Sequence, residues 1–322
     1  PERRATRISL TAEVPPELAG KRLDQIAAQL FPEYSRARLQ SWIKNGELRV
    51  DSRQLRPRDK VLSGATLMVE AALEAADDWS AEALPLDILY EDDSVLVLNK
   101  AAGTVVHPAA GNYSGTLLNG LLHHYPQLQE LPRAGIVHRL DKDTTGLMVV
   151  AKTLPSHTHL VALLQARDIS REYEAVVHGV LTGGGTVDEP LGRHPVNRKK
   201  QAVIYSGKPA ITHFRVMERF RAHTHIHVKL ETGRTHQIRV HMTHIGHSLV
   251  GDPLYGGRLQ IPAGSCAQLN DCLRGFRRQA LHARRLAFAH PLSGEAMSFE
   301  APLPADFQNF LEQLRIDAGQ RP

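Results

Sequence analysis

Basic and acidic residues are separated along this chain, and the separation limits how the chain can fold. Residues 20–60 contain ten Lys and Arg against five Asp and Glu, whereas residues 70–94 contain nine acidic residues and no basic one. So sharp a change in charge indicates a boundary between two folded units. We therefore predict a small basic domain over residues 1–72, an exposed acidic linker over 73–84 and a larger domain over 85–322.

Composition narrows the class of protein. The chain has 322 residues, 42% of them hydrophobic, which is enough apolar material for a packed core. Its formal charge of +5 and pI of about 9.3 fit a polyanionic partner. Cys266 and Cys272 are too few for a disulfide framework or a four-ligand zinc set. Residues 1–10 are charged, and no apolar run approaches the length of a membrane span. We therefore expect a cytoplasmic protein.

The basic segment predicts two short helices and a small sheet. Apolar residues at helical spacing give the first helix a buried face, and Pro32 ends it. Ser35 is a suitable N-cap for a second helix, which Asn45 and Gly46 end. The predicted elements are helices over 23–30 and 36–45 and strands over 48–50 and 66–70.

Three basic side chains, Arg36, Arg38 and Lys44, lie on the second of these helices. Such a cluster favours docking of RNA phosphates, and the alternative is an ordinary solvated helix face. The segment KRLDQIAAQLFPEYSRARLQSWIKNGELRVDSR also resembles the S4-type RNA-binding domain, over about residues 18–70. This resemblance implies that the three residues contact RNA.

The larger part of the chain is rich in predicted strands and has few predicted helices. The two do not alternate regularly, which disfavours a doubly wound parallel sheet. We predict an α+β fold with a mixed, mostly antiparallel sheet. The expected strands lie at 94–99, 146–151, 173–177, 225–230 and 238–241, and the expected helices at 117–124, 156–167 and 307–317.

The segment 135–146 packs polar groups into a turn that leads directly into a buried strand. Loops held by a rigid sheet often carry catalytic groups. Asp141 lies between Arg139 and Lys142, and nearby cations keep a carboxylate ionised, as a nucleophile or base requires. Asp141 is therefore a candidate catalytic residue. The alternative is that it caps the turn or pairs with an arginine.

The segment 231–241 has an alternating pattern that places Gln237, Arg239 and His241 on one face of a strand. An arginine facing an apolar pocket requires an anionic partner, and Asp141 is a candidate. The alternative is a surface strand whose basic face binds phosphates. Arg234 and His236 at its start are predicted to contact RNA in either case.

Two further patterns allow more than one interpretation. Tyr173, on an expected strand, is suited either to the core or to stacking on a base. His241, His244 and His247 are spaced by three, as metal ligands on a helix can be. A zinc hydrolase would normally add a carboxylate or cysteine ligand, and no HExxH motif occurs. We therefore expect no metal.

Three long motifs, in the same order along the chain, resemble the signature regions of the RluA family of pseudouridine synthases. They are HRLDKDTTGLMVVAKT, REYEAV and TGRTHQIRVHMTHIGHSLVGDPLYGG. With the S4-like segment, the likeness extends over about residues 8–315. It implies that Asp141 is the catalytic aspartate, that Tyr173 stacks on the target base and that Arg239 pairs with Asp141.

The resemblance also implies a substrate. Uridine would be isomerised to pseudouridine in 23S ribosomal RNA, in the helix 69 stem-loop, with another ribosomal site or transfer RNA as the alternative. A non-catalytic RNA-binding protein is the remote alternative. Arg139 would enter the RNA stack as the base leaves it, and His138 would contact RNA. The reaction changes no oxidation level, so no cofactor is expected, and we expect a monomer.

Overall fold

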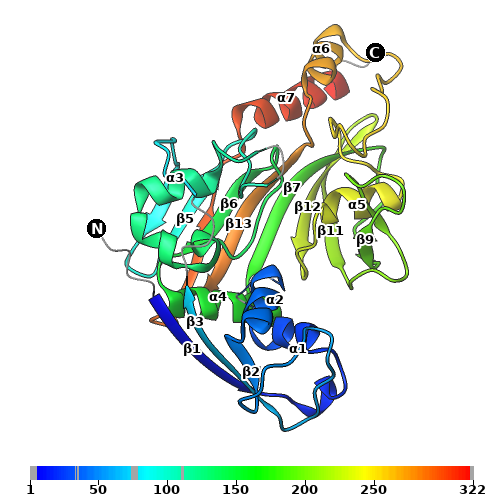
Figure 1. Cartoon of the computed structure of the whole chain (residues 1–322). Coiled ribbons are helices and arrows are strands. Elements are labelled where there is room, and N and C mark those ends of the chain that lie inside the picture. Colours follow the sequence, from blue (N-terminus) through cyan, green and yellow to red (C-terminus); the bar gives the residue numbers. More distant parts are fainter. Residues whose placement is uncertain (1–5, 33, 35, 74–78, 110–111, 320–322) are drawn as a thin grey trace.

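The N-terminal part of the chain forms a small sheet packed against two helices (Figure 1). The computed structural model describes residues 6–32, 34, 36–73, 79–109 and 112–319. The antiparallel sheet has the order β1–β3–β2. Its core is separate from the core of the rest of the chain. The elements are β1 (Thr6–Glu13), the 3-10 helix η1 (Pro16–Leu18), α1 (Leu23–Leu30), α2 (Arg36–Asn45), β2 (Leu48–Val50) and β3 (Thr66–Leu73).

The two helices predicted for this part are confirmed, as are both strands. In α1, the residues Leu23, Ile26 and Ala27 are buried, as their spacing predicted. The proposed N-cap Ser35 lies outside the described residues. β1 was not predicted, although Ile8, Leu10 and Ala12 alternate with polar residues as in a half-buried strand. The division into domains at residues 72 and 85 stays a prediction.

The predicted acidic linker is partly packed against the larger unit. Residues 74–78 lie outside the described residues. In the part that follows, Asn119 Nδ2 donates a hydrogen bond to the Ser80 carbonyl (2.9 Å), and the Glu82 amide donates to the Asn119 carbonyl (3.0 Å). The Glu82 carboxylate accepts from the Gly115 amide at 3.0 Å. The expected exposure of this segment therefore holds for only some of its side chains.

The larger part is organised around a nine-stranded sheet. The strand order is β4–β5–β6–β13–β7–β12–β11–β8, and β14 pairs with β13. Neighbouring strands are antiparallel except β6 and β13. The predicted mixed, mostly antiparallel α+β fold is therefore confirmed. The strands are β4 (Ile88–Glu91), β5 (Val95–Lys100), β6 (Thr145–Ala151), β7 (Ser170–His178), β8 (Gly185–Asp188), β11 (Ile211–Arg219), β12 (His223–Leu230), β13 (Leu281–Ala289) and β14 (Ala296–Glu300).

Helices cover both faces of this sheet, and the strands β5 and β6 are apolar on both sides. α3 (Leu117–His124) and α5 (Gln237–His244) pack on one face, and α4 (Leu154–Ala166) and α7 (Ala305–Gly319) pack on the other. In β6, Met148 contacts the first layer and Val149 the second, as the alternation of a strand requires. Thr116 and Thr153 cap α3 and α4 by accepting hydrogen bonds from backbone amides three residues later.

The remaining elements are short. The strands β9 (Leu191–Arg193) and β10 (Gln201–Val203) form a hairpin beside α5 (Figure 1), and the helix α6 (Ala267–Gly275) packs on α7. Two short 3-10 helices, η2 (Pro126–Glu130) and η3 (Pro132–Gly135), follow α3. Among the described residues, no helix is both long and apolar enough to cross a membrane.

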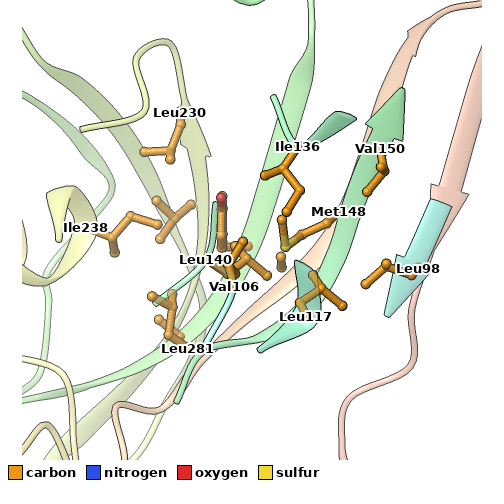
Figure 2. Close-up of a cluster of buried hydrophobic side chains, with 14 of the residues drawn as sticks. Leu98, Val106, Leu117, Ile136, Leu140, Met148, Val150, Leu230, Ile238 and Leu281 are labelled. Atoms are coloured by element: carbon orange, nitrogen blue, oxygen red, sulfur yellow. The ribbon is translucent and has the colours of Figure 1, made fainter. Parts of the chain in front are cut away.

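The core on the α3 and α5 face extends under the segment that carries Asp141. Figure 2 shows Leu140 between Met148 of β6 and Ile238 of α5. Leu140 is only 4% exposed, and burying a leucine contributes about 1.5–3 kcal/mol. This side chain therefore holds the Asp141 segment against the sheet.

We expect Leu140→Ala to lower the free energy of unfolding by about 2–5 kcal/mol, because it opens a cavity at this contact. Urea denaturation followed by circular dichroism measures the loss. Leu292→Ala is the matched control, since Leu292 is 82% exposed and its truncation should change stability by no more than about 0.5 kcal/mol. Equal stability of the two variants would show that Leu140 does not anchor the loop.

Candidate active site

Residues 136–144 form a loop that enters β6, and polar anchors hold it on both sides. The buried ammonium of Lys100, at the end of β5, donates a 2.8 Å hydrogen bond to the Lys142 carbonyl. Arg278 donates to the Asp143 carbonyl at 3.1 Å, and Gln279 donates to the Thr144 hydroxyl at 2.9 Å. Polar groups of neighbouring segments therefore help to fix the position of the loop.

Lys100 serves three backbone carbonyls at once. Besides Lys142, its ammonium donates to the carbonyls of Ala101 (2.8 Å) and Thr104 (3.0 Å). Burial lowers the pKa of Lys100 to about 8, although the negative charges of Asp143 and Asp141 act in the opposite direction. The ammonium remains protonated at neutral pH, and it ties the start of β6 to the turn after β5.

Gly146 lets β6 approach β13 closely at the end of this loop. Its φ is +119°, and an added Cβ would lie 2.3 Å from the Ala283 carbonyl oxygen. No residue with a side chain fits there without displacing β13. The glycine therefore fixes the distance between the Asp141 loop and the centre of the sheet.

Asp141 and Arg239 meet in a partly buried ion pair. Nη1 of Arg239 donates to Oδ2 of Asp141 at 2.8 Å, and the Asp141 side chain is 17% exposed. His236 Nε2 lies 3.8 Å from the other carboxylate oxygen. The predicted partnership of Asp141 and Arg239 thus exists in the structure, and the carboxylate retains an accessible side.

Arg239 is held from behind by Asp252, a residue that sequence reasoning missed. Its Nε and Nη2 donate to the two Asp252 oxygens at 2.7 and 2.9 Å, and the Asp252 side chain is fully buried. Burial favours neutral forms, but the hydrogen bonds and charge of Asp252, with those of Asp141, raise the pKa of Arg239 above its ordinary value. The same pairing lowers the pKa of Asp252 despite its burial.

Backbone amides and an aromatic ring complete this arrangement. The amides of Leu254 and Tyr255 donate to Asp252 Oδ1 at 2.8 and 3.0 Å. The Arg239 guanidinium lies over the Tyr255 ring, 5.0 Å from its centre. The Tyr255 hydroxyl is hydrogen-bonded to His236 Nδ1 at 2.7 Å. The available signal was a single acid, Asp252, in the glycine-rich segment GDPLYGG, and its distance from Asp141 in the sequence gave no indication of contact.

The predicted strand over 238–241 is wrong, because residues 237–244 form the helix α5. Every residue from 237 to 242 is buried, so polar side chains point inward on all sides of the helix. Gln237 and His241, one turn apart, both bond to the Thr212 hydroxyl (3.0 and 2.8 Å), whereas Arg239 reaches Asp141. Buried polar residues alternating with apolar ones imitated the period of a strand.

The three histidines at spacing three do not converge. His241 bonds to Thr212 and to the Glu189 carbonyl, and His247 bonds to the His178 carbonyl. Within the described ranges, no group of three or more His, Cys, Asp or Glu is placed to hold a metal ion.

Tyr173 lies on β7 and faces the same layer as the Asp141 loop. It is 6% exposed and belongs to the core that contains Leu140 and Ile238. Burial raises the pKa of Tyr173, Arg171 lowers it, and the charge of Asp141 raises it further. The phenol therefore lies within electrostatic reach of the Asp141 carboxylate and remains protonated at neutral pH.

His138 and Arg139, next to each other in the loop, differ in environment. His138 Nε2 accepts a 3.0 Å hydrogen bond from the Val149 amide, and burial, with the charge of Arg171, lowers its pKa to about 3. It therefore offers no positive charge to a phosphate, and its contact is internal. Arg139 is exposed and close enough to His236 to influence its pKa.

The other predicted RNA contacts occupy two surfaces. Arg234 is exposed, donates to the Pro209 carbonyl at 3.2 Å and lies two residues from the half-buried His236. On α2, Arg36 and Lys44 are exposed and Arg38 is half-buried. Lys44 also lines an open hollow of about 490 Å³, together with other basic side chains, Arg22, Arg56 and Arg58.

Comparison with known proteins assigns the class. Residues 94–244 match the family model described as RNA pseudouridylate synthase. The solved structure of human RNA Pseudouridylate Synthase Domain Containing 4 is similar, with 25% identity and a TM-score of 0.54 over 71% of this chain and 93% of that chain. These matches, and two relatives that are similar over nearly their whole length, show that the chain belongs to the RNA pseudouridylate synthase family and is an isomerase, as the motifs predicted.

Two curated relatives are similar over nearly their whole length. Ribosomal large subunit pseudouridine synthase D of Pseudomonas aeruginosa is 63% identical over 310 residues, covering 96% of this chain and 97% of the relative. The protein of the same name from Escherichia coli is 53% identical over 314 residues, covering 97% and 96%.

We expect Asp252→Asn to slow isomerisation by about 100-fold in single-turnover assays, because a small displacement of Arg239 misplaces Asp141. An amide offers the guanidinium one acceptor in place of two and no charge. Affinity for RNA should change little, since Asp252 is buried. Asp271→Asn, at a side chain that is 79% exposed on α6, is the control. A folded Asp252→Asn variant with the wild-type rate would exclude this positioning role.

Proposed function

We propose that this chain isomerises uridine to pseudouridine in large-subunit ribosomal RNA, in the helix 69 stem-loop of 23S RNA, with Asp141 as the catalytic residue. The observation that carries the proposal is the 2.8 Å ion pair between Asp141 and Arg239 beside Tyr173. The names of the relatives at 53–63% identity support large-subunit RNA as the substrate. The cytoplasm is the proposed compartment.

The target uridine must leave its stack before it reaches Asp141. Flipping a base costs a few kcal/mol, which phosphate contacts elsewhere can offset. Arg139 lies in the same loop as Asp141 and is exposed, so it can fill the vacated position in the RNA. Arg234 and the basic side chains of α2, Arg36, Arg38 and Lys44, are proposed to bind phosphates.

Once the base is flipped, Asp141 opens the glycosidic bond. It attacks C1′ of the sugar, or it removes a proton from C2′ to give a glycal; both routes start from the ionised carboxylate that Arg239 orients. Tyr173 stacks on the detached uracil while the base turns and C5 bonds to C1′. The bond is broken and formed within one nucleotide, so the reaction needs no external oxidant or reductant.

One copy of the chain supplies the whole arrangement. Asp141, Arg239, Tyr173 and Asp252 come from segments of the same polypeptide. We therefore propose that the enzyme acts as a monomer.

We expect Asp141→Ala to lower the single-turnover rate by about 10⁴-fold or more while RNA binding persists, because the residue that starts bond cleavage is lost. Asp93→Ala, at an exposed position before β5, is the control. In cells that lack this protein, pseudouridine mapping of ribosomal RNA should show helix 69 unmodified. The wild type should restore the modification and Asp141→Ala should not.

Each part of the proposal has its own contrary result. Pseudouridine formation by Asp141→Ala above background would remove this residue from the chemistry. Helix 69 modified without the protein would reject the target, and loss of pseudouridine at another ribosomal or transfer RNA position would identify the correct one.

We expect Arg139→Ala to slow conversion by about 10- to 100-fold and to weaken RNA binding less, because a filled stack stabilises only the flipped state. A 2-aminopurine placed next to the target uridine reports flipping by its fluorescence, and the fluorescence change should shrink in the variant. Arg274→Ala, on the exposed side of α6, is the control. An unchanged single-turnover rate would rule out a role in flipping.

A further inference from the structure

Arg171 is a buried cation next to the active site that the mechanism above does not use. It precedes Tyr173 by two residues on β7, so both side chains face the same layer. It is 7% exposed, and its Nη2 donates a 3.4 Å hydrogen bond to the Glu231 carbonyl. The guanidinium packs on Gly233, where an added Cβ would lie 2.2 Å from Nη1. The glycine therefore leaves room for this charge.

No acidic side chain in the described part of the chain forms an ion pair with Arg171. Its Nε is buried and has no hydrogen-bond partner among the described residues. Burial therefore lowers the pKa of Arg171, whereas the two carboxylates around Arg239 raise the pKa of that arginine. A buried charge without a partner is costly, so its presence beside Tyr173 and His138 calls for an explanation.

Cleavage of the glycosidic bond puts a negative charge on the uracil next to Tyr173. When the N1–C1′ bond breaks, its electron pair leaves with the uracil by either route, so the detached base is an anion delocalised over N1, O2 and O4. When C5 bonds to C1′, the proton on C5 departs and N1 is protonated. The uracil is therefore neutral before and after, and negative only in between.

The residues already assigned do not balance that charge. Once Asp141 has bonded to C1′ or taken the C2′ proton it is neutral, and Asp252 already balances the charge of Arg239, so this cluster offers the anion no net positive charge. Lys100 is occupied by three carbonyls. Arg171 lies on the Tyr173 side, is buried and forms no ion pair with an acid in the described structure, and its charge acts over the short distance at which it already influences the phenol.

Resting on the proposed role of Asp141, we propose that Arg171 stabilises the detached uracil anion electrostatically, from behind the ring of Tyr173. Arg171 is then a positioning residue that acts through Tyr173 and through its charge. Its effect appears only while the base is detached, which distinguishes it from a group that binds RNA in the ground state.

The test compares Arg171→Met, which removes the charge, with Arg171→Lys, which keeps it. On an RNA with uridine at the target, Arg171→Met should be slower than wild type by about 100-fold in single-turnover assays, as for loss of a donor to a developing anion. Arg171→Lys should be within about tenfold of wild type. The affinity for RNA should be unchanged. Arg274→Met, on α6, is the control.

A second RNA carries 5-fluorouridine at the target, because fluorine makes the detached base a weaker base and a better leaving group. Loss of the N1-linked nucleoside is measured. Arg171→Met should slow this cleavage by no more than about tenfold, since the fluorouracil anion is more stable and needs less electrostatic stabilisation from the protein. A structural defect would slow both RNAs equally.

Equal losses on the two RNAs, or Arg171→Lys as slow as Arg171→Met, would overturn the proposal, as would a change confined to RNA affinity. If urea denaturation shows Arg171→Met to be unfolded, Arg171→Gln replaces it as the uncharged variant. Asp141→Ala is assayed alongside. If it retains activity, the proposed role of Asp141 fails; if it is inactive and Arg171→Met matches wild type, only the role of Arg171 fails.

Discussion

The ion pairs of Arg239 connect three segments that are distant in the sequence. The guanidinium joins Asp141, in the loop before β6, to Asp252, which the amides of Leu254 and Tyr255 hold in place. Two carboxylates on one arginine fix its orientation, because each side of the planar group is satisfied by a separate partner. The rest of the fold places α5, the loop and the Asp252 turn where this contact can form. The geometry of the site therefore depends on tertiary packing at every point.

The two faces of the central sheet carry different kinds of side chain. On the face with α3 and α5, Tyr173 and Leu140 lie in one apolar layer. On the opposite face, β7 carries Glu172 and Glu174, which pair with His227 and His225 at 2.8 Å. Paired in this way, both acids have lowered pKa values, although burial acts to raise them.

Local patterns predicted the elements wherever one signal dominated. The strands β5 and β6, which are apolar runs, were predicted, as were the helices α3 and α4. The prediction failed where buried polar residues mixed with apolar ones. In α5 this mixture imitated a strand. In β13, the two arginines Arg284 and Arg285 concealed a central strand, because their partners Glu174 and Glu172 lie on β7.

By itself, the sequence determined the family: the motifs predicted the membership that the comparisons confirm, and they singled out Asp141, Tyr173 and Arg239 as candidate site residues. Only the tertiary structure decided that Asp252 holds Arg239, that His138 bonds internally to Val149, and that Arg171 is buried without an acidic partner in the described structure. The reason is physical. Residue type and local spacing indicate which chemical roles a side chain is capable of. Charge pairing and burial depend on neighbours that are distant in the sequence.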